Sequence, residues 1–358
     1  MHMPRVTMRE VARAAGVHQT TVSLALRNDP RLPESTRSRI QEIAKQIGYR
    51  PDPMLTALNH YRYVRQEPKS PTHIAFLLNF HDRAELNDSY RHRLFVQGAC
   101  EQAERIGFAL DTFYIGHRVH EAGPRIERVL EARGIVGVIL AAFGDQMAKF
   151  KMNWDRFSIV RIESQQLDQP LHTVSSNQMG ITREAVRRLS KLGYRRIGLA
   201  VGESDETCLR NAFSAGYHVE VALHPGLSNL PPLLFPDGMG TSDIAPALAN
   251  WIRSYQIDVI ISNWHEVPEA LQLAGLRLPD DIVVASLDLN PDRGVNAGIR
   301  QNHGSVGERA VEQVALLMRT HQRGLGRPNN STLIDGEWVD GSDVPPRNME
   351  LNARATHP

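Results

Sequence analysis

Residues 7–26 constrain the fold of this 358-residue chain more than any other segment. Thr7 and Glu10 have the T-x-x-E spacing of a capping box, in which each side chain can satisfy the other residue's backbone N–H group. Apolar residues then recur on one helical face, and Gly16 tolerates the left-handed conformation that ends many helices. A second short helix is expected from His18. The segment therefore predicts two short helices joined by a tight turn.

This arrangement is typical of a helix-turn-helix motif, whose second helix enters the major groove of DNA. An ordinary αα-hairpin would have the same pattern. A third helix is predicted over 33–47, ending at Gly48. Residues 1–66 contain eleven basic and five acidic side chains, a net charge of +6, whereas the whole chain carries only +1. A basic head on an acidic body is typical of a module that binds a polyanion, although a solvated basic surface gives the same count.

From His73 onward, short apolar runs alternate with helical patterns, which predicts parallel sheets built from βαβ units. The expected strands are Ile74–Leu78, Ala109–Ile115, Val136–Ala141, Ser158–Ile162, Arg196–Val201, Asp258–Ser262 and Ile282–Leu287. The expected helices are Arg93–Ile106, Gly123–Ala132, Gln178–Leu192, Thr207–Ala222, Ser242–Tyr255 and Ser305–Arg323. These strands are numerous enough for two sheets.

The head resembles the lac repressor/galactose repressor family of bacterial transcription regulators. The matching residues are Val6-Thr7, Val11-Ala12, Ala15-Gly16-Val17, Thr21-Val22-Ser23, Thr36-Arg37, Ile47-Gly48-Tyr49-Arg50-Pro51 and Ala57-Leu58. Weaker matches continue at Asn177-Gln178-Met179-Gly180, Leu192-Gly193-Tyr194-Arg195-Arg196-Ile197, Arg210, Ser262-Asn263, Leu278-Pro279-Asp280-Asp281-Ile282 and Asp288. The resemblance implies a small all-α helix-turn-helix head and an α/β core of two doubly wound subdomains, similar to periplasmic binding proteins.

The same resemblance implies the domain boundaries. Residues 1–60 would be the DNA-binding domain, with a hinge helix at about 53–59, followed by a linker at 61–71. Residues 72–345 would bind the effector and form the dimer. Their first subdomain is expected at about 72–172 and 300–325, and their second at about 173–299 and 326–345. The polar tail at 346–358 is expected to be disordered.

Candidate DNA contacts come from the predicted second helix and its flanks. Gln19 and Thr20 lie in its first turn, where side chains reach base edges. Leu24 is expected to point away from the core, where it could contact a thymine methyl group or be a scattered surface leucine. The expected contacts with the DNA backbone, which fix register without reading sequence, are His18, Ser23, Arg27, Asn28, Arg37 and Arg50.

Leu58 is implied by the resemblance to be a minor-groove wedge. In the family a leucine at this position of the hinge helix inserts between base pairs and kinks the duplex. A seven-residue helix is marginal alone, so it is expected to order on DNA. Packing in a linker or dimer contact is the alternative for Leu58.

The effector cleft is also implied by the resemblance, through Arg210, Asn263 and Asp288. A guanidinium and a carboxylate that face each other suit a ligand with many hydroxyl groups, but each residue could instead belong to a surface ion pair. Trp264 stands where the family usually has Asp, and could stack on a sugar ring or fill a closed cleft. Ser176 and Leu289 also replace acidic residues of the family pattern.

No catalytic, cofactor or metal-binding motif is complete in the sequence, so we expect no enzyme activity, cofactor or metal. Without a signal peptide or an apolar run long enough to span a bilayer, the chain is expected to be cytoplasmic and nucleoid-associated. The expected partners are a double-stranded DNA operator, a small-molecule effector of the carbohydrate class and a second copy of the chain. The alternative is an α/β small-molecule binding protein or enzyme whose helical head makes protein contacts.

Overall fold

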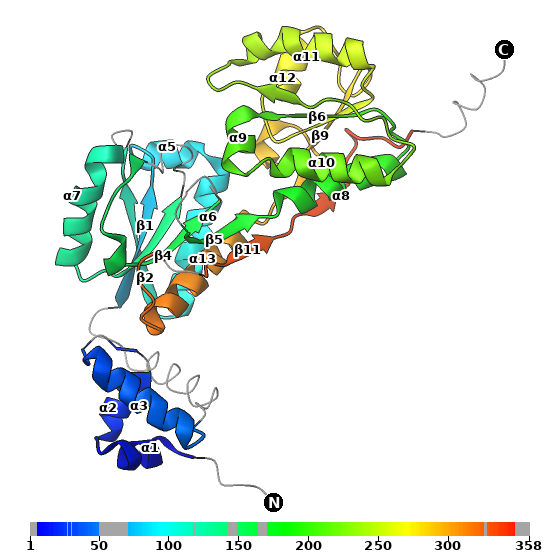
Figure 1. Cartoon of the computed structure of the whole chain (residues 1–358). Helices are drawn as coiled ribbons and strands as arrows, with labels where there is room; N and C mark the ends of the chain where they lie inside the picture. The colour runs from blue at the N-terminus through cyan, green and yellow to red at the C-terminus, as the bar shows by residue number, and fades with distance from the viewer. Residues whose placement is uncertain are drawn as a thin grey trace, which may run out of the picture.

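The computed structural model describes residues 6–26, 28–29, 31–49, 71–116, 119–141, 143, 149–163, 170–325 and 328–347. A small helical head precedes an α/β part made of two subdomains, each with its own sheet (Figure 1). This confirms the fold class predicted from the sequence. Within these ranges, no helix is long and apolar enough to cross a membrane.

The head contains α1 (Met8–Ala15), α2 (Gln19–Leu26) and α3 (Glu34–Gln46). The carboxylate of Glu10 accepts hydrogen bonds from the backbone N–H and the hydroxyl of Thr7, at 2.6 and 2.9 Å. Gly16 ends α1 at φ 66°, a conformation that costs glycine little because it has no Cβ. The three helices enclose a core in which these residues are buried: Val11, Ala12, Ala15, Val22, Ala25, Ile40 and Ala44.

The first subdomain has a six-stranded sheet in the order β11-β5-β4-β3-β1-β2, with all neighbours parallel. Its strands are β1 (Thr72–Leu78), β2 (Phe108–Tyr114), β3 (Gly137–Ala141), β4 (Ser158–Ile162), β5 (His172–Ser176) and β11 (Ser331–Ile334). Its helices are α5 (Arg83–Asp88), α6 (Tyr90–Arg105), α7 (Val119–Ala132), α13 (His303–Arg319) and the 3₁₀ turn η2 (Trp154–Arg156). Separate apolar clusters cover the two sheet faces, as expected for parallel strands.

The second subdomain repeats this plan, with the sheet order β12-β10-β9-β8-β6-β7 and one antiparallel edge pair, β10 with β12. Its strands are β6 (Ile197–Gly202), β7 (Leu233–Phe235), β8 (Val259–Ser262), β9 (Val283–Ser286), β10 (Gly298–Arg300) and β12 (Glu337–Val339). Its helices are α8 (Gln178–Lys191), α9 (Glu203–Cys208), α10 (Ala212–Leu223), α11 (Thr241–Tyr255), α12 (Val267–Leu273) and η3 (Pro291–Arg293).

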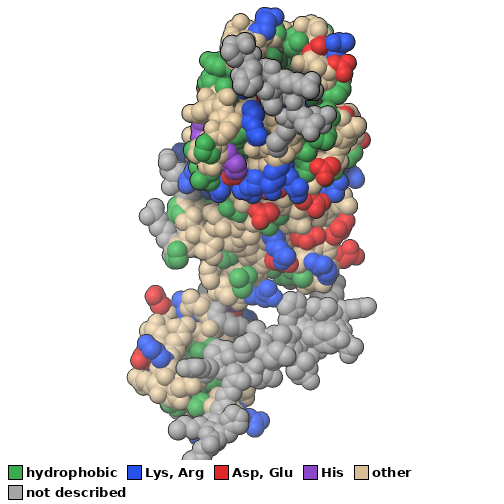
Figure 2. Space-filling model, turned by 90° about the vertical axis from the view of Figure 1, so that its right-hand side faces the viewer, with side chains coloured by type: hydrophobic (Ala, Val, Ile, Leu, Met, Phe, Trp, Pro, Cys, Tyr) green, Lys and Arg blue, Asp and Glu red, His purple; other side chains and the backbone are tan. Residues whose placement is uncertain are grey.

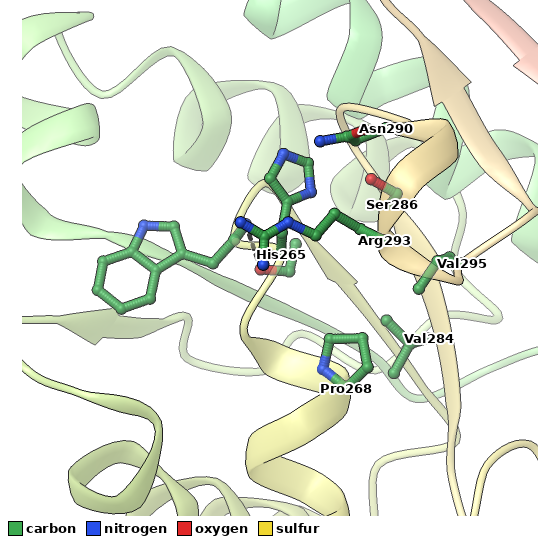
Figure 3. Close-up of a pocket in the computed structure, with 9 residues that line it drawn as sticks. His265, Pro268, Val284, Ser286, Asn290, Arg293 and Val295 are labelled. Atoms are coloured by element: carbon green, nitrogen blue, oxygen red, sulfur yellow. Dashed lines mark hydrogen bonds between the residues drawn. The ribbon is translucent and has the colours of Figure 1, made fainter. Parts of the chain in front are cut away.

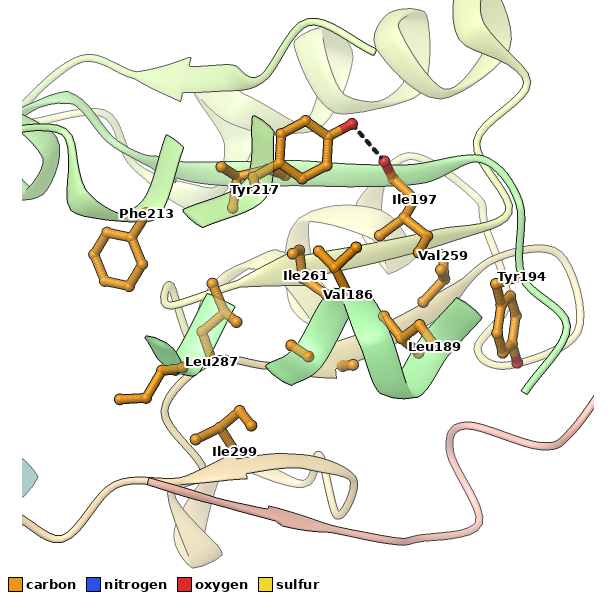
Figure 4. Packing of buried hydrophobic residues seen from close by; sticks show 14 of the residues in the cluster. Val186, Leu189, Tyr194, Ile197, Phe213, Tyr217, Val259, Ile261, Leu287 and Ile299 are labelled. Atoms are coloured by element: carbon orange, nitrogen blue, oxygen red, sulfur yellow. Dashed lines mark hydrogen bonds between the residues drawn. The ribbon is translucent and has the colours of Figure 1, made fainter. Parts of the chain in front are cut away.

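Buried residues of α8, α10 and the central strands form one continuous core in this subdomain (Figure 4). The hydroxyl of Tyr217, which is fully buried, donates to the carbonyl of Ile197 at 2.9 Å. This bond satisfies the one polar atom of a large side chain that otherwise contributes only apolar surface.

The chain passes between the subdomains three times, and side-chain amides join the passages. Asn177 donates to the Asp335 carboxylate at 2.7 Å, and Asn302 donates to the Asp335 carbonyl at the same distance. The buried amides of Gln178 and Gln301 bond each other at 3.2 Å. This network connects the three passages, so any change in the angle between the subdomains must rearrange it.

Strand pairing puts two of these passages later than we expected. β5 and β11 belong to the first sheet, so the chain leaves the first subdomain after Ser176 and again after Ile334, rather than near residues 172 and 325. The helix expected over Thr207–Ala222 is also interrupted: Arg210 and Asn211, between α9 and α10, both have positive φ. Local apolar spacing continues across this break, so the sequence pattern could not reveal it.

Candidate functional sites

The first turn of α2 presents polar side chains to solvent. Gln19 and Thr20 are exposed, whereas Val22 and Ala25 on the opposite side are buried in the head's core. Leu24 is half-buried rather than exposed, and the Asp29 N–H group donates to its backbone carbonyl. Two of the three residues expected to read bases are thus exposed, and the third, Leu24, is half-buried without belonging to the head's core.

His18 immediately precedes α2, and its ring accepts a hydrogen bond from the first turn of that helix. The backbone N–H of Thr20 donates to Nδ1 of His18 at 3.3 Å, and the Thr20 hydroxyl lies 3.0 Å from the same nitrogen. Because the backbone can only donate, Nδ1 must be the acceptor, which puts the imidazole hydrogen on Nε2. The exposed ring therefore keeps a donor for a phosphate oxygen.

The remaining expected backbone contacts lie close to α2. Arg37 on α3 donates to the Asn28 carbonyl at 3.0 Å, and Asn28 takes a left-handed conformation at φ 59°. Arg37 therefore supports the loop after α2, and Ser23 is half-buried on α2 itself. Arg27, Arg50 and the expected wedge Leu58 lie outside the described residues.

A cavity of about 240 Å³ lies between the two subdomains. The first subdomain lines it with Asp88, Ser89, Tyr90 and Arg91, and the second with Asp205, Asn263, Trp264, His265, Glu266, Asp288, Asn290 and Arg293. Several of these residues follow the carboxyl ends of β6, β8 and β9. In the second sheet the strand order reverses between β6 and β8, and open α/β sheets bind ligands at such a switch point.

Asn263 lies at this switch point. Its amide nitrogen donates to the Asp205 carboxylate at 2.7 Å, while its amide oxygen is buried without a hydrogen-bond partner. Buried polar atoms are nearly always bonded, so this oxygen is available to a hydroxyl donor. The Asn263–Asp205 bond fixes the direction in which that acceptor points.

Trp264 forms a wall of the cavity. Its ring stacks on Phe235 with centroids 4.8 Å apart, and its backbone N–H donates to the Ser262 hydroxyl at 3.0 Å. Behind it lies a recess the size of one water molecule, about 10 Å³. Figure 3 shows His265, Asn290 and Arg293 with their polar ends directed into one region beside this recess. Burial lowers the pKa of His265, which favours a neutral ring there.

Asp288 and His303 form a buried pair across a passage between the subdomains. Nε2 of His303 lies 2.8 Å from Oδ1 of Asp288, with side-chain exposures of 1% and 9%. The Asp288 backbone N–H donates to the Ser286 hydroxyl. Asp288 therefore joins β9 to the start of α13, in addition to lining the cavity.

Arg91 links the two subdomains electrostatically. It lies 3.9 Å from Glu163 of the first subdomain and 3.9 Å from Asp205 of the second. Burial disfavours its charge, but the nearby carboxylates outweigh burial and raise the pKa of Arg91. An arginine between carboxylates of both subdomains stabilises their approach.

Of the four residues expected in the cleft, the structure brings Asn263, Trp264 and Asp288 together. Arg210 is exposed in the turn after α9 and does not line the cavity. Sequence reasoning missed Arg91, Asp205 and His303, which carry no motif. It also missed Glu163, although a charged residue directly after an apolar strand was a usable signal.

The chain is similar to known transcription regulators. A family model described as "Bacterial regulatory proteins, lacI family" matches residues 7–52. The HTH-type transcriptional regulator PtxS of Pseudomonas plecoglossicida is 28% identical over 230 residues, which is 62% of this chain and 62% of PtxS. The HTH-type transcriptional repressor CytR of Escherichia coli K12 is 44% identical over 48 residues, 13% of this chain and 14% of CytR. The chain thus spans about three fifths of the length of PtxS.

Solved structures share the fold over nearly the whole chain. A lac repressor dimer bound to operator and the anti-inducer ONPF has a TM-score of 0.57 at 18% identity, covering 96% of this chain and 100% of that one. A complex of the transcriptional regulator CelR with cellobiose has a TM-score of 0.59 at 18% identity, covering 95% and 100%. At this identity the likeness concerns the fold.

Proposed function

We propose that the chain belongs to the lac repressor/galactose repressor family and acts as a repressor, which is supported by the family-model match to residues 7–52 and by the similar fold of the whole chain. In this proposal a homodimer binds a pseudo-palindromic operator through residues 1–60. A small hydroxylated effector of the carbohydrate class binds between the subdomains and controls DNA affinity. The protein acts in the cytoplasm, associated with the nucleoid.

The exposed first turn of α2 carries the DNA-binding proposal. Gln19 can pair with adenine through its amide, and Thr20 can donate, accept or touch a thymine methyl group. His18 keeps a free Nε2–H for a phosphate, because its other nitrogen caps the helix. Two such heads on a symmetric dimer would read inverted half-sites, and Leu58 would act as the wedge at the operator centre.

The cavity between the subdomains supports the effector proposal. Asn263 presents a bonded amide with one unpartnered oxygen, and Asp288 presents an acceptor held by His303. Trp264 supplies an aromatic wall, and Arg210 would approach from the turn after α9. Acceptors, donors and an aromatic surface together suit a sugar, whose ring has apolar faces and a hydroxyl rim.

Ligand binding between the subdomains can control the head only if the ligand prefers one subdomain angle. The amides of the three passages and the Arg91 ion pairs have to rearrange when that angle changes. Coupling must also be reciprocal: an effector that weakens operator binding is itself bound more weakly in the presence of operator.

Selection of duplexes from a random library by the full-length chain tests the proposal. We expect an inverted-repeat site, and an affinity that falls steeply with salt because phosphate contacts release counterions. The selected duplex then reports release by a panel of sugars, and sedimentation gives the assembly state. A chain that selects no duplex, or that stays monomeric at micromolar concentration, would contradict the proposal.

A further inference from the structure

Arg161 is a buried arginine that lacks an acidic partner. It lies on β4, next to the carboxyl end of the strand, and is only 5% exposed. Its Nε donates to the Thr173 hydroxyl at 2.9 Å, whereas its Nη1 is buried without any hydrogen-bond partner. Buried guanidinium groups are almost always paired with a carboxylate or phosphate, so this one lacks the group that would satisfy it.

The charges around Arg161 do not compensate its own positive charge. Burial, together with the charge of a second arginine, Arg210, lowers the pKa of Arg161 to about 10. No ion pair joins either arginine to a carboxylate within the described ranges. Other buried arginine contacts show the contrast, since Arg183 and Arg187 both bond the buried carboxylate of Glu220.

The two arginines come from different subdomains. Arg161 belongs to the first sheet and Arg210 to the turn between α9 and α10 of the second subdomain, and the charge of Arg210 helps to lower the pKa of Arg161. Two guanidinium groups from different subdomains repel each other unless an anion lies between them. Surface arginines alone would not indicate such a site. Lys and Arg side chains also gather in a band on an outer face of the α/β part (Figure 2).

Three carboxylates of the cleft already have partners. Glu163 and Asp205 face Arg91, and Asp288 bonds His303. Asp88 and Glu266 also line the cavity, whereas Arg161 and Arg210 have no ion pair among the described residues.

We propose that the effector carries a carboxylate or phosphate group, which Arg161 and Arg210 hold between the two subdomains, so that it is an acidic sugar rather than a neutral one. A guanidinium binds both kinds of oxyanion through parallel N–H···O bonds. This inference rests on the proposed function, because it assigns part of the effector to that site. It also explains why Arg210 is exposed and has no ion pair among the described residues: its partner would arrive with the ligand.

The test is a thermal-shift and calorimetric comparison of the full-length chain with matched ligands. D-Gluconate and D-glucuronate provide the carboxylate, D-glucose 6-phosphate provides the phosphate, and D-glucose and sorbitol are the neutral counterparts. We expect one acid class to raise the melting temperature and the neutral compounds to leave it unchanged, which also distinguishes carboxylate from phosphate. Arg161→Gln should bind that acid on the order of ten- to a hundredfold more weakly, since a charge-assisted bond is lost.

Arg161→Gln also distinguishes a ligand role from a structural one. Without ligand its melting temperature should equal or exceed that of wild type, because a buried uncompensated charge is removed. The matched control Arg253→Gln changes an exposed arginine of α11 and should alter neither quantity. Arg161→Gln that melts several degrees lower yet keeps the acid-induced shift would overturn the proposal.

Other results separate this inference from the proposed function. Stabilisation by a neutral sugar as strong as by its acid, or no stabilisation by any acid, overturns the inference. If an operator is nevertheless selected and a neutral sugar releases it, the regulator proposal stands alone. If no duplex is selected, the proposed function fails, whatever the acids do.

Discussion

Replacing Asp288 with alanine should lower the free energy of unfolding by about 3 kcal/mol, because it leaves Nε2 of His303 buried and unbonded. The two groups are 2.8 Å apart with side-chain exposures of 9% and 1%, so the hydrogen bond that is lost is a buried one. Asp288→Asn keeps an acceptor oxygen for His303 and loses only the charge, so its cost should be near 1 kcal/mol. Both values follow from one hydrogen bond and its burial.

Urea unfolding of wild type and both variants measures these differences, with Asp237→Ala as control. Asp237 is exposed and has no ion pair among the contacts of the described residues, so the control should stay within about 0.5 kcal/mol. Calorimetry with the identified effector then isolates ligand binding in Asp288→Asn, whose fold is nearly intact. If Asp288→Ala unfolds at the wild-type midpoint, or both variants lose equal stability, the buried pair does not hold the passage as argued.

Four further results are expected. His18→Ala should speed hydrogen exchange at the start of α2 and cost about 1 kcal/mol of helix stability, whereas His18→Ser should restore a cap; equal exchange in all three proteins would contradict the ring cap. Leu58→Ala should abolish most of the operator bend in a circular-permutation assay, and unchanged bending would remove the wedge. Burial, aided by Arg91 and His303, holds the pKa of His92 well below 6.5. As the pH falls, the unfolded chain therefore takes up a proton at this residue before the folded chain does, so the free energy of unfolding should decrease below about pH 6.5. Urea midpoints at about pH 7 and pH 5 should show a smaller decrease in His92→Phe than in wild type. A methyl group on Gly307 would lie 2.0 Å from the Phe95 carbonyl oxygen, whereas one on Gly304 meets nothing within 4 Å. Gly307→Ala should therefore lower the free energy of unfolding by about 1–3 kcal/mol and reduce the thermal midpoint, whereas Gly304→Ala should change neither.

The sequence by itself determined the head and most of the central strands. The capping box at Thr7, the left-handed Gly16 and the apolar spacing of α1 and α2 act within a few residues, so their outcome depends little on the rest of the chain. The same holds for runs such as Ile74–Leu78, which can be buried on both faces in only a few ways.

Tertiary structure decided the subdomain boundaries and the chemistry of the cleft. β5 has the polar sequence HTVSS and was not expected as a strand, yet it is buried because β4 and β11 flank it and helices cover it. Arg161 stands in a strand that any pattern reads as apolar, and only the approach of Arg210 from the other subdomain shows that it lacks a counter-ion. Burial and charge pairing depend on residues far apart in the chain, and local sequence carries no record of which of them will meet.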